Sequence, residues 1–230
     1  MRRSHGPRTG GLADRPGASI SLEDPPPHQN GRRRQRAKSR DQILQAAFEI
    51  LCEMGVRKMT IEAVAEAAGV GKTTIYRWWR SKGLLALEAF EHGFGVLEPT
   101  EPPSTGSLRT DLWQLARRLL QSKGTVAYRL GPQIIAEAQA DPDLAAEIYN
   151  RMILPYRSMQ TPVFEKAVQR GEISESVDTG LVLDALYGAY FHRVLLHHGE
   201  IDHAFFDALV DLLVSGAQAI HVRERNQAPG

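Results

Sequence analysis

A donor-rich run of side chains lies between Lys72 and Arg77. Within it an ammonium, two hydroxyls, a phenol and a guanidinium come from Lys72, Thr73, Thr74, Tyr76 and Arg77. Such groups donate hydrogen bonds to phosphate oxygens and to base edges in the major groove of a duplex. Ile75 is the one apolar member, so we expect it to face inward on a short helix from Lys72 to Trp79. The other side chains would then form a surface suited to nucleic acid.

The preceding stretch predicts a second short helix that would hold this surface in place. One apolar face at helical spacing is formed by Ile61, Val64, Ala65 and Ala68. Thr60 precedes this face, where its hydroxyl can cap the first turn, and such a position also suits a backbone phosphate. Gly69 is expected to end the helix in a left-handed conformation. Two short helices joined by a tight turn form a helix-turn-helix, although a plain helical hairpin with a solvated basic face is the simpler alternative.

An amphipathic helix is expected to complete a three-helix head. It would run from about Ala37 to Met54 and end at Gly55, with a buried stripe formed by Leu44, Ala47, Phe48 and Leu51. Cys52 lies in this helix and is the only cysteine, so an internal disulfide is excluded and we expect it to pack in the interior.

The segment from Arg40 to Leu85 resembles the TetR family of bacterial transcriptional regulators. The resemblance rests on MTIEAVAEAAGVGKTTIYRWWRSKGLL and on the amphipathic helix before it. Two positions depart from the family pattern, because Trp79 stands where Phe is frequent and Gly83 where Glu is frequent. Further along, the chain resembles the C-terminal domain of one TetR subgroup at Gly171-Glu172-Ile173, Gly188 and Tyr190-Phe191-His192-Arg193.

Charge is unevenly distributed along the 230 residues. Residues 31–82 contain 12 Lys and Arg against 5 Asp and Glu, whereas residues 83–230 contain 12 against 19. A basic front and an acidic rear indicate a module that binds a polyanion, attached to one that does not. Residues 1–36 are expected to be a disordered basic arm. This arm is either a solvated tail or a contact to the DNA backbone or minor groove.

The patterns predict an all-α fold with a helix-turn-helix domain at 37–82, a helical effector-binding and dimerisation domain at 83–222, and a tail at 223–230. A further helix should begin near Ser81 and link the two domains, followed by a loop from Glu91 to Ser107. The rear helices are expected at Leu108 to Ser122, Thr125 to Ala140, Pro142 to Arg170 with interruptions near Pro155 and Pro162, Val177 to His198, and Asp202 to Ile220.

The last two of these helices are apolar over much of their circumference, and little chain follows that could cover them. Such helices must be covered on most sides. The same helix pair from a second copy would supply the cover, so we expect a homodimer with a four-helix seam, unless the earlier helices cover both.

These observations favour a sequence-specific transcriptional regulator, most simply a repressor, that binds a pseudo-palindromic operator as a homodimer. The expected DNA contacts are Thr60, Lys72, Thr73, Thr74, Tyr76, Arg77 and Lys82. The resemblance implies release from the operator by a small apolar or amphipathic effector in the rear domain. Candidate ligand contacts, for each of which plain core packing is the favoured explanation, are Trp113, Tyr128, Met152, Tyr156, Tyr187 and His192.

Other classes of function have weaker support in the sequence. The histidines His192, His197, His198 and His203 match no metal-ligand spacing, and no catalytic pattern or cofactor motif is evident, so we expect neither an enzyme nor a cofactor. We expect no apolar run long enough for a bilayer span, and the single cysteine suits a reducing compartment, which together favour the cytoplasm. A helical small-molecule carrier or a protein-interaction adaptor with an incidental basic head stays as the alternative.

Overall fold

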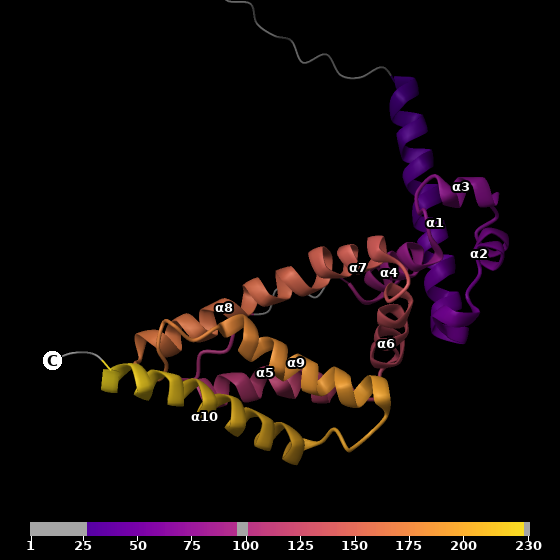
Figure 1. Cartoon of the computed structure of the whole chain (residues 1–230). Coiled ribbons are helices and arrows are strands. Elements are labelled where there is room, and N and C mark those ends of the chain that lie inside the picture. Colours follow the sequence, from indigo (N-terminus) through magenta and orange to yellow (C-terminus); the bar gives the residue numbers. More distant parts are fainter. Residues whose placement is uncertain (1–26, 96–100, 228–230) are drawn as a thin grey trace, which may run out of the picture. The chain divides into compact units, whose positions relative to one another are not determined.

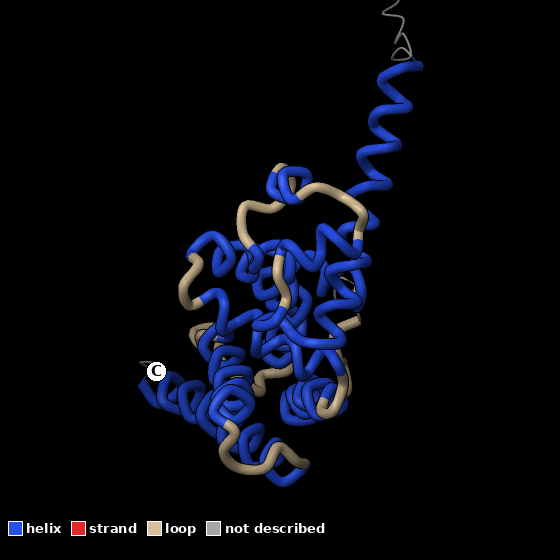
Figure 2. Tube along the Cα trace, turned by 90° about the vertical axis from the view of Figure 1, so that its right-hand side faces the viewer, coloured by secondary structure: helices blue, strands red, loops and turns tan. Residues whose placement is uncertain are grey.

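The computed structural model describes residues 27–95 and 101–227, and the side chains of residues 35–95 and 101–220. Within these ranges the secondary structure is helical, without a strand, as the sequence predicts (Figure 2). The chain divides into two units at residues 1–37 and 38–230, and the packing described below is that of the second. The elements in chain order are α1 (Pro27–Lys58), α2 (Ile61–Ala67), α3 (Lys72–Tyr76), α4 (Lys82–Phe94), α5 (Leu108–Ser122), α6 (Val126–Ala138), α7 (Pro142–Ile148), η1 (Tyr149–Ile153), α8 (Leu154–Gln169), α9 (Thr179–Leu196) and α10 (His203–Gln227).

The first helix begins earlier than its pattern predicts. Its first residue is Pro27 rather than a residue near Ala37, so part of the expected arm is helical, while residues 1–26 lie outside the described residues. Gly55 interrupts the helix with a φ of 78°, as expected of the glycine that ends the amphipathic stretch. The predicted stripe of this helix faces the interior, and Phe48 is its only half-buried member.

The third helix is shorter than expected. It ends at Tyr76, and the N–H groups of Trp78 and Trp79 both donate to the carbonyl of Ile75, at 2.9 and 3.0 Å. This tight turn places the Trp79 side chain in the core. The next helix, α4, is longer than expected and continues to Phe94, so the loop begins at Gly95 rather than at Glu91.

The long rear helix expected from Pro142 to Arg170 consists of three pieces. Asp141 caps α7 by accepting the N–H of Leu144 at 3.1 Å, and Gly171 follows α8 with a φ of 72°, both as expected. Between the α-helices lies the π-helix η1, just ahead of Pro155. Proline has no N–H for the carbonyl four residues earlier, and a wider π-turn accommodates the missing bond. Pro132 and Pro162 lie inside α6 and α8 without ending them.

Buried apolar side chains form two clusters. The first is centred on the head but continues through α4 into α6 and α7, where Leu130, Ile134 and Leu144 belong to it. The second lies among α5, α8, α9 and α10, which pack side by side in the rear of the molecule (Figure 1). The predicted domain boundary at residue 82 therefore falls inside the first cluster.

The last helix is unusually apolar for its exposure. By length and composition the stretch His203–Ile220 could cross a membrane, with a mean hydropathy of 1.2, whereas no apolar run of that length is expected from the sequence. Only 22% of this stretch is buried. Two aspartates within it contact α5: Asp207 accepts the indole N–H of Trp113 at 2.7 Å, and Asp211 pairs with Arg109 at 2.6 Å. One face of α10 is therefore fixed on α5 by polar contacts.

Candidate nucleic-acid interface and its supports

The helix-turn-helix forms as its sequence predicts. The Thr60 hydroxyl caps α2 by accepting the N–H of Ala63 at 3.1 Å, and Gly69 takes a left-handed φ of 64° after the helix. Ile75 is fully buried, while Thr73 and Arg77 are exposed. A five-residue helix would be unstable alone, so the burial of Ile75 must hold α3 against α2.

The expected DNA contacts fall into two groups. Thr60, Lys72, Thr73, Tyr76 and Arg77 are exposed, with Tyr76 at 52%, and Thr74 is half-buried. Lys72 pairs with Glu62 at 3.0 Å on this surface, and its hydrogen bond lowers the pKa of the Glu62 carboxyl. Lys82 differs, because its ammonium donates to the carbonyl of Val56 at 3.1 Å and pairs with Glu137 of α6 at 3.2 Å. A phosphate contact would require Lys82 to leave both partners.

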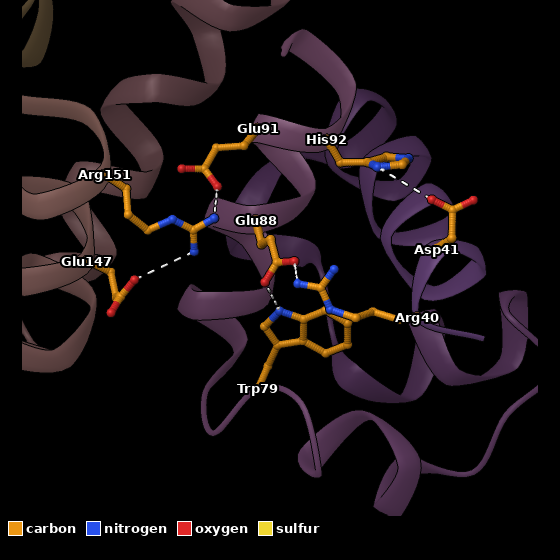
Figure 3. Close-up of polar contacts among 8 residues, drawn as sticks. All are labelled: Arg40, Asp41, Trp79, Glu88, Glu91, His92, Glu147 and Arg151. Carbon is orange, nitrogen blue, oxygen red and sulfur yellow. Dashed lines mark hydrogen bonds and ion pairs between the residues drawn. The ribbon is translucent and has the colours of Figure 1, made fainter. Parts of the chain in front are cut away.

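Behind the interface, three side chains tie the end of α3 to α1 and α4 (Figure 3). The indole N–H of buried Trp79 donates to Glu88 at 2.8 Å, and the same carboxylate pairs with Arg40. The Arg40 guanidinium also lies 5.6 Å from the centre of the Trp79 ring, within cation–π range. The sequence marked Trp79 only as a departure from the family pattern. Nothing in the sequence connects residues as distant as Arg40 and Glu88.

The helix α4 also contacts the rear domain through an ion pair. Glu91 is 8% exposed and pairs with Arg151 of η1 (Figure 3). The Arg151 guanidinium also pairs with the Glu147 carboxylate, with 3.6 Å between nitrogen and oxygen. Burial raises the pKa of the Glu91 carboxyl, and the positive charge of Arg151 opposes that rise. Glu88 and Glu91 lie three residues apart, so adjacent turns of one helix bind the head and the rear domain.

Further polar contacts join the head to α6 and α7. The N–H of Val56 donates to Gln133 at 2.9 Å, and the hydroxyl of Ser81 donates to Asp141 at 2.7 Å. Gly83 allows the close approach of α4 to α7, because a Cβ at that position would lie 2.6 Å from a methyl carbon of Leu144. The departure at Gly83 thus has a packing reason.

The six expected ligand contacts do not form one site. Two of them meet, because the rings of Tyr156 and Tyr187 lie edge to face with centroids 5.7 Å apart. The other four lie elsewhere. The indole of Trp113 donates to Asp207 and contacts the ring of His203, while His192 is exposed and its ring contacts that of His198. Tyr128 packs against the apolar cluster of the rear domain, and Met152 packs against that of the head. The sequence did not indicate Gln160, whose side-chain amide donates to the Tyr187 hydroxyl at 2.5 Å.

No metal site is evident in the part of the chain that the structure describes. Within it, no three His, Cys, Asp or Glu side chains are grouped to hold an ion. Cys52 is half-buried, and burial raises the pKa of its thiol, which disfavours the reactive thiolate.

Two family descriptions match most of the described chain. Residues 43–89 match "Bacterial regulatory proteins, tetR family", and residues 102–213 match "Tetracyclin repressor-like, C-terminal domain". The first match covers the helix-turn-helix and most of α4, and the second covers α5 to α9 and the first part of α10.

Individual proteins are similar over most of their length. The uncharacterized HTH-type transcriptional regulator YdeS of Bacillus subtilis (strain 168) is 33% identical over 198 residues, which are 82% of this chain and 97% of YdeS. A DNA-binding transcriptional repressor of Mycobacteroides abscessus is 33% identical over 172 residues, 74% of this chain and 88% of that protein. A crystal structure of a TetR family transcription regulator is 35% identical with a TM-score of 0.61, and the match covers 78% of this chain and 98% of that one.

Proposed function

The chain belongs to the TetR family of bacterial transcriptional regulators, and we propose that it is a homodimeric repressor released from a pseudo-palindromic operator by a small molecule. This family consists of DNA-binding regulators rather than enzymes. A regulator of this kind acts where the DNA is, which supports a place in the cytoplasm.

The observation that supports DNA binding best is the exposed donor surface of α3 around the buried Ile75. In a helix-turn-helix the second helix enters the major groove with its N-terminal residues toward the bases. On α3 this position belongs to Thr73 and Thr74, with Arg77 just beyond the helix. Lys72, Tyr76 and the capped Thr60 lie beside them, at positions suited to phosphates.

The exposed leucines of the last two helices support the homodimer. Leu181 and Leu196 of α9 and Leu212 of α10 are 63–70% exposed in the single chain. Large apolar side chains gathered on neighbouring helices mark an interaction surface. A two-fold axis would place the same helix pair of the second copy on this surface and bury both sets. Burial by the second copy would also explain why α10, although apolar, is mostly exposed in the single chain.

The helix α4 is the structural basis for a response to an effector. It contacts the head through Glu88 and the rear domain through Glu91. An effector that fits better when α4 is shifted would move the two heads relative to each other. The change in operator affinity can be no larger than the preference of the effector for that shifted state. The effector itself would be apolar or amphipathic, since the helices of the rear domain enclose an apolar cluster.

A titration of the purified full-length protein into labelled DNA tests the proposal. One duplex comes from just upstream of its own gene, and the control is a scrambled duplex of equal length, each at two salt concentrations. Preference for the native duplex, with affinity falling steeply as salt rises, is expected because bound phosphates release counterions. Equal binding to both duplexes at both salt concentrations would favour the carrier or adaptor alternative.

A pair of arginine variants locates the interface. Arg77→Ala should weaken binding to the native duplex by about 5- to 150-fold for each half-site, since a bidentate base contact contributes roughly 1–3 kcal/mol. Arg117→Ala removes an exposed arginine of α5 in the rear domain and should leave operator affinity unchanged. Both variants should stay dimeric. Equal affinity of Arg77→Ala and the parent would place the recognition surface elsewhere on the head.

A further inference from the structure

The side chain of Gln160 on α8 is buried but only half satisfied. It is 2% exposed, and its amide nitrogen donates to the Tyr187 hydroxyl at 2.5 Å. Its carbonyl oxygen Oε1 is buried and has no hydrogen-bond partner among the described residues. Buried polar atoms are nearly always paired, because leaving one unpaired costs about 1–3 kcal/mol. An acceptor at this position therefore needs an explanation.

The neighbouring phenols do not supply the missing donor. Burial, more than any other influence, raises the pKa of Tyr187 far above its ordinary value, so the phenol keeps its proton. The Tyr156 phenol, whose ring centroid lies 5.7 Å from that of Tyr187, contributes to that rise in pKa. The Tyr187 oxygen accepts from the amide nitrogen of Gln160. The Tyr187 hydroxyl therefore contacts the nitrogen end of the amide, and Oε1 is left without a donor among the described residues.

Burial changes along the face of α8 that carries this acceptor. Along that face Ala167, Phe164 and Gln160 are buried, and Tyr156 is half-buried. These residues recur three or four positions apart and so share one side of the helix. Burial on this face therefore decreases from Gln160 to the Tyr156 ring, one turn closer to the start of α8.

Charge near the site disfavours a cationic ligand. Arg118 of α5 lies close enough to Tyr187 to lower the pKa of the phenol against the effect of burial. The Arg118 guanidinium donates to the backbone carbonyl of Glu101 at 3.4 Å, so it keeps its positive charge near the site. A positive group would be repelled there and would pay for its own desolvation. A neutral donor meets neither cost.

We propose that Gln160 is the polar anchor of the effector site, and that the effector is a mostly apolar small molecule presenting a neutral hydroxyl or N–H to Oε1. This inference rests on the proposed function, since it names the chemistry of the ligand in the effector-binding domain. Tyr187 would act as a positioning residue, because its hydroxyl holds the nitrogen end of the Gln160 amide, and Tyr156 packs against the Tyr187 ring.

Three probes of equal heavy-atom count test the proposal on the full-length protein. These are 1-octanol, its isomer 1-methoxyheptane, which lacks the donor, and octylammonium, which is charged. Calorimetric titration should find 1-octanol binding at least about tenfold more tightly than either of the others, because only it pairs Oε1 without a charge. Gln160→Met keeps the length of the side chain and removes the acceptor, so the ratio of alcohol to ether affinity should fall to about one.

Two further variants control for indirect effects. Gln139→Met changes an exposed glutamine of α6 and should keep the tenfold ratio. Tyr187→Phe removes the hydroxyl that holds the nitrogen end of the amide, so the preference for the alcohol over the ether should shrink while the affinity for the ether stays the same. This second variant decides the question together with the parent protein if Gln160→Met does not fold.

Operator binding, measured in parallel, separates the two levels of inference. A parent protein that ignores its operator contradicts the proposed function, whatever the probes do. If operator binding is intact while alcohol and ether bind equally, or neither binds at millimolar concentration, the anchor is wrong and Oε1 is paired by a buried water instead. Tighter binding of octylammonium than of 1-octanol would overturn the argument from charge.

Discussion

The head and the rear domain arrange their polar and apolar side chains in opposite ways. The head buries its apolar side chains around Ile75 and presents hydroxyls, a phenol and charges outward. The rear domain exposes large leucines on α9 and α10 and buries an amide at Gln160. A region that recognises a rigid polyanion needs polar groups on its outside. The proposed roles of the rear domain, binding a small molecule and joining a second copy, require the opposite arrangement, with polar groups inside and apolar groups at the seam.

The largest effect should come from breaking the seam of the rear domain. Leu212→Glu places a charge on a large apolar residue that is 70% exposed, the highest value among the described large apolar side chains of α10. Two copies would meet across the two-fold axis, so the dimer should dissociate and operator affinity should fall about 100-fold or more, since both half-sites are needed for tight binding. Analytical ultracentrifugation and the operator titration measure the two quantities.

Val126→Glu is the matched control for this prediction. It adds the same charge at an exposed apolar residue in the first turn of α6, where an acidic group suits the helix dipole. The control should stay dimeric. A dimeric Leu212→Glu protein would move the seam away from α10.

An intermediate effect should come from testing how tightly each region is packed. A Cβ at Gly93 of α4 would lie 2.0–2.3 Å from ring atoms of Phe48, whereas one at Gly131 of α6 meets nothing within 4 Å. Gly93→Ala should therefore lower the free energy of unfolding by about 1–3 kcal/mol. Gly131→Ala should raise it by roughly 0.5–1 kcal/mol, because alanine is the better helix former. Urea denaturation measures the free energy of unfolding of both variants. If Gly93→Ala also raised this free energy, the Phe48 ring would have to move aside without cost.

The smallest effect concerns the contact between the two regions. Burial raises the pKa of Glu91 above the ordinary carboxyl value of 4.5. The folded chain therefore holds this proton more tightly than the unfolded chain, so the stability it contributes is complete below pH 4.5 and is lost as pH rises through the folded pKa. Glu91→Gln removes the titration, so its melting temperature relative to the parent should increase from pH 4 to pH 7.

Glu147→Gln is the control, because Glu147 contacts the same Arg151 while remaining about half exposed. It should show no comparable trend with pH. A relative melting temperature that falls with pH for Glu91→Gln would mean that the attraction of Arg151 outweighs burial.

The sequence predicted the head better than the rear domain, for a physical reason. The cap at Thr60, the left-handed Gly69 and the inward Ile75 are local features, each determined by a few neighbours along the chain, and all three are confirmed. The extent of α5 and the caps at Ser81 and Asp141 follow from similar local rules. The π-helix was indicated only as an interruption near Pro155, because proline predicts a missing hydrogen bond but not how the backbone responds.

Contacts between distant residues could not be predicted in this way. The pairs Arg40–Glu88 and Glu91–Arg151 join helices whose relative position depends on the whole packing. Trp113 and Met152 were predicted as ligand contacts because their side chains are large or flexible, but such side chains are equally common in a protein core. Gln160 was missed since one glutamine among apolar residues gives no periodic signal. Its burial with an unpaired oxygen appears only once α8 and α9 are packed.

The continuity of the head cluster with α6 and α7 limits how this regulator could be rebuilt as a biosensor. A chimera that joins residues 1–82 to a foreign sensing domain would leave behind Gln133, Glu137 and Asp141, the partners of Val56, Lys82 and Ser81. It would also expose the apolar surface that Leu130, Ile134 and Leu144 now cover. A graft that includes these three polar partners, or redesigns the receiving helices to reproduce them, should keep its head folded. An interchangeable part of this protein is thus larger than its DNA-reading motif.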